Sequence, residues 1–502
     1  MSLLIQRLRE HADRRAGDTA VQEFQGSQPG RKTTWGQLIE DVSGFQRRLS
    51  DEPDEAVMIA SKNRVEVLAA LLGALGMGRQ VLLASPHSTR SELTQLIETA
   101  SISAVLGDTE ACQTVMGLGV RTYAIDSLTP GGGGEELIDV GTGAVLLQSS
   151  GTTGPPKIVV RERFALDSVG TQVTRALGLQ AGNRMLVMIP LYHSYGLDMA
   201  VLAGLTSGCQ LDLHEAFKPA AATTALQSGG LDLWPAVPVM LDAVSRGTDP
   251  SERPGSGCVF SAGSPLPLAV ARRFEKRFGL RLGQIYGTSE FGSVTYNDPE
   301  DADYDPCCAG SPMEGVKIRV IGSDGSPLGP REEGEVVVSG PSVMSGYLDG
   351  TKPIIRLEDD SYVQTGDTGL MDAMGRLYLT GRTKLFIDVG GQKVNPIEVE
   401  SVLARFPGVR EVVVVSTLYT ATADRVKAIL LPEEGSTVEI ASLREFAKRH
   451  LSPFKVPRRF EIRKELPRSP TGKVLRSELQ AAELDEGRTR ARLPSEDAKS
   501  GT

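Results

Sequence analysis

The chain has 502 residues, of which 40% are hydrophobic and 23% are charged. This composition is typical of a folded globular protein of about two to four domains, and it excludes a chain that is mainly disordered. Lysine and arginine number 54 against 63 aspartate and glutamate, so the formal net charge is −9, which argues against an extended nucleic-acid-binding surface.

In the first part of the chain, short apolar strands alternate with helices. We expect a strand over residues 57–60, a helix over 65–77 and another strand over 80–84. This order predicts parallel strands, because a crossover helix returns the chain in the same direction. The alternation continues to about residue 300 and predicts an α/β fold.

Beyond that point the strands are short and are joined by Gly/Asp turns. The runs KIRVI, GEVVVSG and RLYLTG predict a small antiparallel, barrel-like part. A compact α+β unit follows, for which we expect helices over 396–405 and 440–450 and strands over 409–416, 426–431 and 459–462.

The chain therefore divides into a large N-terminal domain over residues 1–382 and a small C-terminal domain over 383–485. Residues 486–502 are polar, and we expect them to be disordered. Five scattered cysteines without a C-x-x-C pair predict neither a disulfide framework nor a zinc site. The N-terminus has no apolar core long enough for a signal peptide, and no apolar run in the chain is long enough for a membrane span, so we expect a cytoplasmic protein.

The clearest motif is a glycine-rich loop between two apolar strands, SSGTTGPPK over residues 149–157. Glycines let consecutive backbone N–H groups converge on an anion, hydroxyls add donors, and the lysine adds positive charge. The spacing G-x-x-G-x-x-K, followed by a strand, differs from the Walker type, which opens a helix. We predict a phosphate-binding loop of Ser149, Ser150, Gly151, Thr152, Thr153, Gly154 and Lys157.

Four further segments carry groups that suit one nucleotide. QIYGTSE, over residues 284–290, offers an aromatic face for a base, hydroxyls for phosphate and a carboxylate for a divalent cation. Asp367 in a glycine turn can accept both ribose hydroxyls, and GRTK over 381–384 follows it. PTGK places Lys473 on a loop of the small domain. Each segment is a weak signal alone, but their order and spacing together predict a nucleotide site.

With these motifs the chain resembles the adenylate-forming superfamily of acyl-CoA synthetases, peptide-synthetase adenylation domains and luciferases. SSGTTGPPK resembles the phosphate loop of that family, YGTSE its Y-G-x-[ST]-E box, TGD its ribose motif, GRTKLFIDVGGQKVNPIEVE its hinge segment and PRSPTGK its C-terminal lysine loop. The resemblance covers nearly the whole chain. It implies a large N-terminal domain of α/β subdomains plus a barrel, and a small mobile C-terminal domain.

The resemblance implies a two-step reaction. A carboxylate attacks the α-phosphate of ATP to give acyl-AMP and pyrophosphate, and the thiol of coenzyme A or of a carrier's pantetheine then attacks the carbonyl. It implies Lys473 as the adenylation lysine, Lys384 as the hinge and Glu290 as the Mg²⁺ ligand. The further nucleotide contacts that it implies are Gly263, Ser264, Gln284, Tyr286, Gly287, Ser289, Asp367 and Arg382, with Tyr286 against the adenine and Asp367 and Arg382 on the ribose.

The resemblance also implies an acyl pocket lined by His193, Tyr195, Ala262, Ile285 and Gly287. Amino-acid-activating relatives have an aspartate where His193 stands, so a free α-amine has no obvious counter-ion; His193 either contacts the substrate or is a packing residue. Many binders of long or aryl acids have glycine at Ile285, so we expect a compact acid. Asp388 replaces the lysine that is common in the hinge segment, and the role of that lysine is not carried over.

Three functions remain open from the sequence. The first is an ATP-dependent ligase that joins a small carboxylic acid to coenzyme A, with ATP and Mg²⁺. The second is a stand-alone adenylation enzyme that loads an acyl carrier protein or an amine acceptor. The third is a non-catalytic nucleotide-binding protein, which the presence of Lys473, Glu290 and Asp367 together disfavours. We expect the first function, with no nucleic-acid partner and no membrane span.

Overall fold

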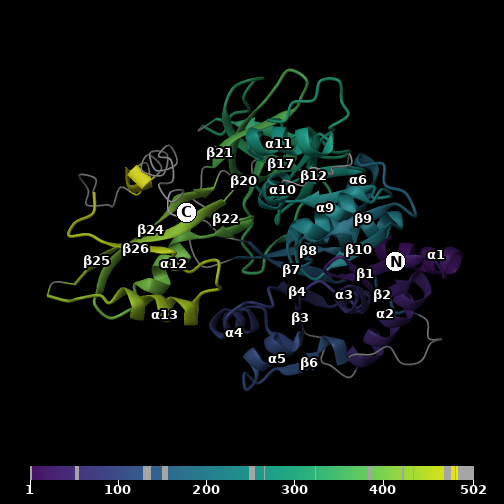
Figure 1. Cartoon of the computed structure of the whole chain (residues 1–502), viewed down its shortest axis with the longest axis horizontal. Helices are drawn as coiled ribbons and strands as arrows, with labels where there is room; N and C mark the ends of the chain where they lie inside the picture. Colours follow the sequence, from purple (N-terminus) through teal and green to yellow (C-terminus); the bar gives the residue numbers. More distant parts are fainter. Residues whose placement is uncertain are drawn as a thin grey trace, which may run out of the picture. The chain divides into compact units, whose positions relative to one another are not determined.

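The computed structural model describes residues 3–50, 56–127, 137–149, 157–247, 255–264, 266–322, 324–382, 387–420, 423–433, 435–467, 476, 478–480 and 482–483. Contacts within the chain define two units, of which the first comprises residues 1–149 and 157–384 and the second begins at residue 385. Figure 1 labels their helices and strands. The predicted tail over 486–502 lies outside the described residues.

The first unit contains a seven-stranded sheet of β3 (Ala56–Ala60), β4 (Gln80–Ala84), β5 (Ile102–Gly107), β6 (Arg121–Ala124), β7 (Ala144–Ser149), β8 (Lys157–Glu162) and β18 (Gly346–Tyr347). Its order is β18-β8-β7-β4-β3-β5-β6. Strands β3 to β7 are parallel, as predicted, because α3 (Val65–Gly76), α4 (Arg90–Thr99) and α5 (Thr109–Val115) return the chain between successive strands. Strands β8 and β18 extend one edge in antiparallel pairing.

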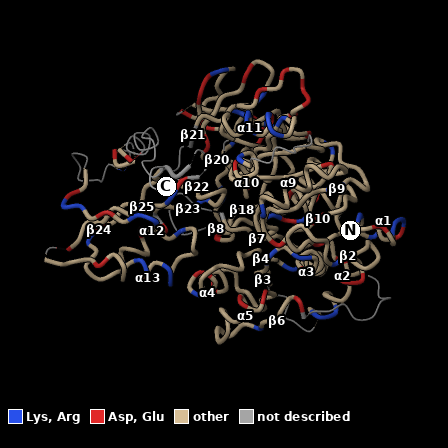
Figure 2. The backbone as a smooth tube through the Cα atoms, in the orientation of Figure 1, with Lys and Arg blue, Asp and Glu red and all other residues tan. Residues whose placement is uncertain are grey.

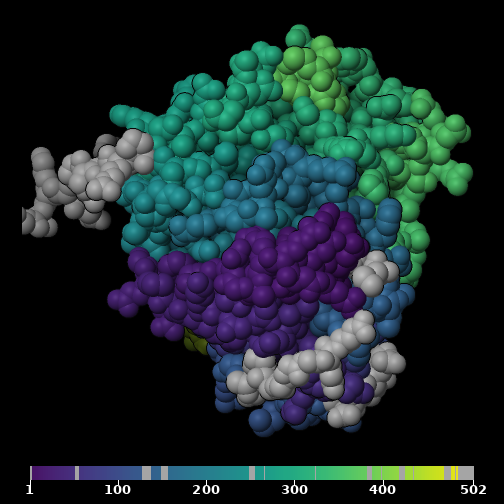
Figure 3. Space-filling view, turned by 90° about the vertical axis from the view of Figure 1, so that its right-hand side faces the viewer, coloured from purple at the N-terminus to yellow at the C-terminus, as the bar shows by residue number. Residues whose placement is uncertain are grey.

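A second sheet has nine strands in the order β15-β14-β13-β12-β11-β9-β10-β1-β2. The bounds are β1 (Thr19–Gln25), β2 (Gln28–Thr34), β9 (Arg184–Val187), β10 (Gln210–His214), β11 (Leu233–Ala236), β12 (Cys258–Ser261), β13 (Leu282–Thr288), β14 (Gly292–Asn297) and β15 (Ser311–Pro312). The associated helices are α1 (Leu3–Arg15), α2 (Trp35–Leu49), α6 (Arg163–Ala176), α8 (Gly204–Ser207), α9 (Pro219–Gln227), α10 (Pro238–Ser245) and α11 (Leu268–Phe278). Figure 3 shows the N-terminal residues, in purple, on the outside of the first unit.

Helix α3 joins the cores of the two sheets. Of its residues only Glu66 is not buried, and an apolar helix of this kind is expected between layers. Its leucines and alanines belong to one apolar cluster with Val57 and Ile59 of β3 and with Val21 and Leu211 of the second sheet. The core therefore fixes the spacing of the strands whose ends carry the candidate site.

The part of the first unit predicted to be barrel-like is a five-stranded antiparallel sheet. Its strands are β16 (Lys317–Ile321), β17 (Gly334–Ser339), β19 (Ile354–Leu357), β20 (Asp360–Met371) and β21 (Leu377–Arg382). The long strand β20 carries the TGD motif and pairs with β21, with Asp367 opposite Arg382.

The second unit is the predicted α+β arrangement. It contains a hairpin of β22 (Ile387–Val389) and β23 (Gln392–Val394), a sheet of β24 (Val409–Thr420), β25 (Ala423–Pro432) and β26 (Arg459–Ile462), and helices α12 (Pro396–Leu403) and α13 (Ile440–His450). Basic and acidic residues are interspersed along both units (Figure 2). In the part of the chain that the structure describes, no helix is both long and apolar enough to cross a bilayer.

Candidate active site

Strands β7 and β8 form a hairpin whose last pair is Ser149 and Lys157, so the predicted phosphate loop is the hairpin connection. Residues 150–156, including Ser150, Gly151, Thr152, Thr153 and Gly154, lie outside the described residues. The Lys157 Nζ lies 3.3 Å from Thr351 Oγ1 and 4.5 Å from the centroid of the Tyr347 ring. The sheet thus holds the lysine at the exit of the loop, and its ammonium group lies over an aromatic face.

Ser289 and Glu290 lie in the turn between β13 and β14. The Glu290 backbone N–H donates to Thr288 Oγ1 (3.2 Å), and the Tyr347 hydroxyl donates to Glu290 Oε1 (3.2 Å). Burial and the neighbouring Glu290 charge raise the pKa of the Tyr347 hydroxyl, so it remains a donor at neutral pH. Tyr347 therefore contacts both Lys157 and Glu290, and the structure brings these two predicted residues together.

The Glu290 carboxylate suits a metal ion that is bound together with the phosphates of a nucleotide. Glu290 is half-buried, and its Oε2 makes no hydrogen bond within the described ranges. The described residues contain no group of three His, Cys, Asp or Glu side chains that could hold a metal ion. Mg²⁺ is commonly bound by one or two carboxylates together with substrate phosphates, so one carboxylate fits a nucleotide-bound ion.

Tyr286 and Asp367 are joined directly, because the Tyr286 hydroxyl donates to Asp367 Oδ2 (2.7 Å). The contact connects β13 of the second sheet to β20 of the antiparallel sheet. Both side chains are buried, and the Asp367 backbone N–H donates to Thr365 Oγ1 (3.0 Å). The backbone of Arg382 lies opposite Asp367, whereas its side chain is outside the described part of the structure.

The segment predicted to line the acyl pocket follows β9 and leads into a π-helix, Leu197–Ala203. The His193 ring packs against Tyr192 (4.8 Å between centroids) and makes no hydrogen bond among the described residues. Burial lowers the pKa of His193 to about 4, so the ring is neutral at pH 7.

Two residues that follow in this segment fix its position. Ser194 Oγ donates to the Thr288 carbonyl (3.4 Å), which connects this segment to the YGTSE box. A Cβ at Gly196 would lie 2.1 Å from the Pro190 carbonyl oxygen, so only glycine fits there.

Two further predicted pocket residues lie on adjacent strands: Ala262 directly follows β12, and Ile285 lies in the middle of β13. Ala262 and Ile285 are 6% and 4% exposed. The Tyr195 hydroxyl donates to the Phe260 carbonyl (3.2 Å), so its ring is the part left to contact a ligand. Gln284 donates both amide hydrogens to the carbonyls of residues 306 and 308 (2.7 and 2.8 Å), which leaves its Oε1 for the predicted nucleotide contact.

The glycine-rich ends of the same strands allow close backbone approach. Gly263 has a positive φ of +87° in the turn that also contains Ser264. A Cβ at Gly287 would lie 2.2 Å from the Gly292 carbonyl oxygen across the β13–β14 hairpin. Glycine at 287 is therefore required by the hairpin, whatever further contact it makes with ligands.

Sequence reasoning missed two polar contacts beneath these segments. Asn63 donates to the Ile189 carbonyl (2.9 Å) and accepts from the Leu191 N–H (2.9 Å), so it holds the start of the His193 segment. Arg161 and Asp198 form a fully buried ion pair. The available signals for the pair were Arg161 directly after the apolar run 158–160 and Asp198 as the single charge within the run 197–205.

Lys473 and Lys384, which have predicted catalytic roles, lie outside the described ranges. Arg476, three positions after Lys473, pairs with Glu400 of α12 (2.5 and 2.6 Å), which anchors the chain next to the lysine loop. Asp388, which replaces the lysine common in the hinge segment, accepts from the Gly391 N–H (2.7 Å) and lies opposite Lys393 in the β22–β23 hairpin. Asp388 therefore stabilises this turn.

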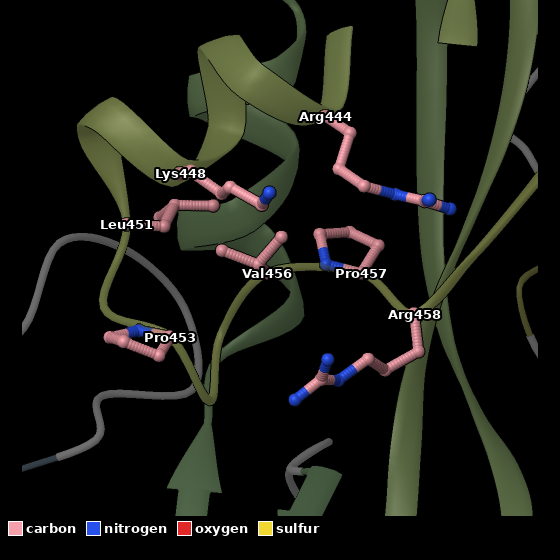
Figure 4. Close-up of a pocket in the computed structure, with 7 residues that line it drawn as sticks. All are labelled: Arg444, Lys448, Leu451, Pro453, Val456, Pro457 and Arg458. Atoms are coloured by element: carbon pink, nitrogen blue, oxygen red, sulfur yellow. The ribbon is translucent and has the colours of Figure 1, made fainter. Parts of the chain in front are cut away.

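A basic pocket of 530 Å³ lies in the second unit at α13 and the segment before β26. Arg444 and Lys448 come from α13, and Arg458 precedes β26 (Figure 4). Neither arginine forms an ion pair with any residue that the structure describes. The remaining lining is apolar: Leu451, Pro453, Val456 and Pro457. Such a pocket has the charge to accept phosphate groups.

Comparison with known proteins identifies relatives along nearly the whole chain. The profile of the family described as AMP-binding enzyme matches residues 8–348, and that of the AMP-binding enzyme C-terminal domain matches 398–473. The chain is 33% identical to sulfoacetate–CoA ligase of Cupriavidus necator over 341 residues, which are 67% of this chain and 66% of that enzyme. It is 29% identical to 2-succinylbenzoate–CoA ligase of Geobacillus kaustophilus over 462 residues, which are 90% of this chain and 93% of that enzyme. A solved structure of o-succinylbenzoate CoA synthetase from Bacillus subtilis, bound to a product analogue, superposes with a TM-score of 0.83 at 25% identity and covers 96% of this chain and 98% of that chain.

Proposed function

Because this chain belongs to the AMP-binding enzymes, a family of acyl-adenylate-forming ligases, we propose that it activates a compact carboxylic acid with ATP and transfers the acyl group to coenzyme A. The observation that carries the proposal is the convergence, around Tyr347, of Lys157 from the phosphate-loop hairpin and Glu290 from the YGTSE turn. A cation and a carboxylate in this arrangement suit a magnesium–nucleotide complex.

In the proposed first step, a carboxylate oxygen of the acid attacks the α-phosphorus of ATP, and the bond to the pyrophosphate oxygen breaks. Acyl-AMP and pyrophosphate result. A free carboxylate is a poor electrophile because its leaving group would be oxide, whereas AMP leaves readily. In the second step the thiol sulfur of coenzyme A attacks the acyl carbon, AMP leaves and the thiol proton is released. Negative charge gathers on the phosphates in the first step, so cationic groups are needed there.

The chain's own residues divide these tasks. Lys473 would supply positive charge to the adenylation transition state, and the 149–154 loop with Ser289 would bind the phosphates. Asp367 and Arg382 would hold the ribose beside Tyr286. Glu290 would hold Mg²⁺, which when bound neutralises phosphate charge. Lys384 would be the hinge that moves the small domain between the two steps.

The residues of the predicted acyl pocket support the proposal that the substrate is a compact acid. Ile285 within β13 and Ala262 directly after the adjacent β12 are both buried, and the neutral His193 offers no charge to pair with an ammonium group. The relatives named above act on sulfoacetate and 2-succinylbenzoate, acids of different bulk. The identity of the acid is therefore best decided by a panel.

The basic pocket of the second unit favours coenzyme A over a carrier protein as the acceptor. Coenzyme A carries a 3′-phosphate and a diphosphate, which Arg444, Lys448 and Arg458 suit. The alternative is a carrier's pantetheine thiol or an amine acceptor. The five free cysteines support the further inference that the enzyme works in the cytoplasm.

Pyrophosphate release and thioester formation across a panel of acids, with coenzyme A present or absent, test this function. We expect acid-dependent release of pyrophosphate without coenzyme A and acyl-CoA only when it is present. If no acid of the panel drives release, adenylation is contradicted. If pyrophosphate is released but only a carrier protein or an amine is acylated, the alternative acceptor is correct.

A further inference from the structure

The segment over residues 344–351 links two parts of the nucleotide site that are remote in the sequence. The Met344 N–H donates to the carbonyl of Glu290 (2.8 Å), and the Ser345 N–H donates to the carbonyl of Val160 in β8 (3.0 Å). The backbone of this segment therefore connects the YGTSE turn to the strand that leaves the phosphate loop.

The Tyr347 side chain also connects these two parts of the site, because it contacts both Glu290 and Lys157. Its hydroxyl donates to Glu290 Oε1 (3.2 Å), and its ring lies 4.5 Å from Lys157 Nζ. Lys157 also contacts Thr351 Oγ1 (3.3 Å), whose hydroxyl donates to Asp349 Oδ1 (2.6 Å). The phenol is therefore held by strand pairing, by the ammonium group over its face and by the carboxylate at its tip.

We propose that Tyr347 is a positioning residue that orients the Glu290 carboxylate for its cation and couples it to Lys157. This inference rests on the proposed function, in which Glu290 holds Mg²⁺. The hydroxyl occupies Oε1, so Oε2 is the oxygen presented to the ion. Outer partners of a ligating carboxylate fix its direction, and their loss commonly weakens metal binding about 10- to 100-fold.

Two single variants separate positioning from packing. Tyr347→Phe removes the hydroxyl but keeps the ring beneath Lys157. Tyr378→Phe is a matched control, because Tyr378 donates to Asp305 Oδ2 at the same distance of 3.2 Å, in a pair to which no function is assigned. The full-length variants are compared by Mn²⁺ binding in the presence of a non-hydrolysable ATP analogue, followed by electron paramagnetic resonance, with melting curves to establish that each is folded.

We expect Tyr347→Phe to weaken Mn²⁺ binding about 10-fold and Tyr378→Phe to leave it unchanged. Glu290→Gln should weaken binding as well, because a neutral amide is a poorer ligand for a hard cation, and Tyr347→Phe should then add little when it is combined with Glu290→Gln.

Different results would overturn the metal role of Glu290 and the positioning role of Tyr347. Wild-type Mn²⁺ affinity in Glu290→Gln would overturn the metal role of Glu290 and with it the positioning role. If Glu290→Gln weakens binding while Tyr347→Phe does not, only the positioning role is overturned. If Tyr347→Phe weakens Mn²⁺ binding by the same factor in the wild-type protein and in Glu290→Gln, the positioning role is also overturned, because the hydroxyl would then act through another group.

Discussion

Nη1 of Arg161 lies 2.7 Å from Oδ1 of Asp198, in an ion pair whose side chains are 0% and 1% exposed. Arg161 belongs to β8, which leaves the phosphate loop, and Asp198 belongs to the π-helix after the His193 segment. Asp198 Oδ2 also accepts from the Ser293 hydroxyl (3.1 Å) of β14. The pair therefore joins three elements that carry the nucleotide and acyl parts of the site.

We predict that Asp198→Ala lowers the free energy of unfolding by about 3 to 5 kcal/mol, because it leaves a buried guanidinium without its counter-ion. The control is Glu314→Ala, which breaks an exposed pair with Arg175 and should cost less than about 1 kcal/mol. Urea unfolding measures both. Equal losses in the two variants would contradict a stabilising role for the buried pair.

Much of the fold could be predicted because it depends on local patterns. The strand at 80–84 and the helix at 440–450 lie where the apolar pattern placed them. The predicted end of a strand at Ser416 was wrong, since β24 continues to Thr420. The apolar run ends at Val415, but backbone pairing with β25 continues regardless of side-chain polarity.

Contacts in the site were less predictable because they join residues that are distant in the sequence. The YGTSE motif predicted Glu290, but nothing local marks Tyr347, 57 positions later, as its partner. Gln284 was predicted as a nucleotide contact from its motif alone. Its amide hydrogens are donated to carbonyls about 20 positions away, and these hydrogen bonds are seen only in the folded structure.

The lowered pKa of His193 predicts a pH dependence of stability. Its ordinary pKa is 6.5 and burial lowers it to about 4, so between these values the unfolded chain binds a proton that the folded chain does not. The free energy of unfolding should therefore fall as the pH is lowered through this window. His193→Gln should flatten the fall. His214, whose pKa burial also lowers to about 4, is present in both proteins, so the difference reports on His193. Parallel pH profiles of urea unfolding would contradict the assignment.

The basic pocket predicts how coenzyme A is recognised. Arg458→Ala should raise the KM for coenzyme A about 5- to 10-fold, because it removes a charge-assisted contact to phosphate, and leave acid-dependent pyrophosphate release unchanged. Arg449→Ala is the control, since Arg449 lies on α13, which contributes Arg444 and Lys448 to the pocket, but does not itself line the pocket. Steady-state kinetics with coenzyme A and with dephospho-coenzyme A measure the effect. An Arg458→Ala enzyme with the wild-type KM for coenzyme A would exclude this pocket as its phosphate site.

Lys473→Ala should abolish formation of acyl-AMP but leave thioester formation from supplied acyl-AMP mostly intact. The reason is that the family resemblance assigns this lysine to the first step only, before the small domain rotates. Pyrophosphate release measures the first half-reaction, and thioester formation from synthetic acyl-AMP measures the second. Equal loss of both half-reactions would show that Lys473 is not specific to adenylation.

Ile285→Gly should broaden the range of acids towards longer or aromatic ones. Ile285 is 4% exposed and directly precedes Tyr286 in β13, so we expect its side chain to occupy space that a larger acyl group would need. One methylene of fit is worth roughly 1 to 3 kcal/mol in such pockets, so discrimination between acids should shift by about 10- to 200-fold. The kcat/KM values across acids of increasing length measure the shift.

Loss of stability is the competing effect of the same substitution, because truncating a core isoleucine to alanine already costs about 2 to 5 kcal/mol. Melting curves therefore accompany the kinetics, and Ile285→Val, which costs only about 0.5 to 1.5 kcal/mol, serves as the milder variant. It should move the preference in the same direction by a smaller factor. If folded variants of both kinds keep the wild-type ranking of acids, Ile285 does not face the acyl group, and the expectation of a compact substrate loses its basis.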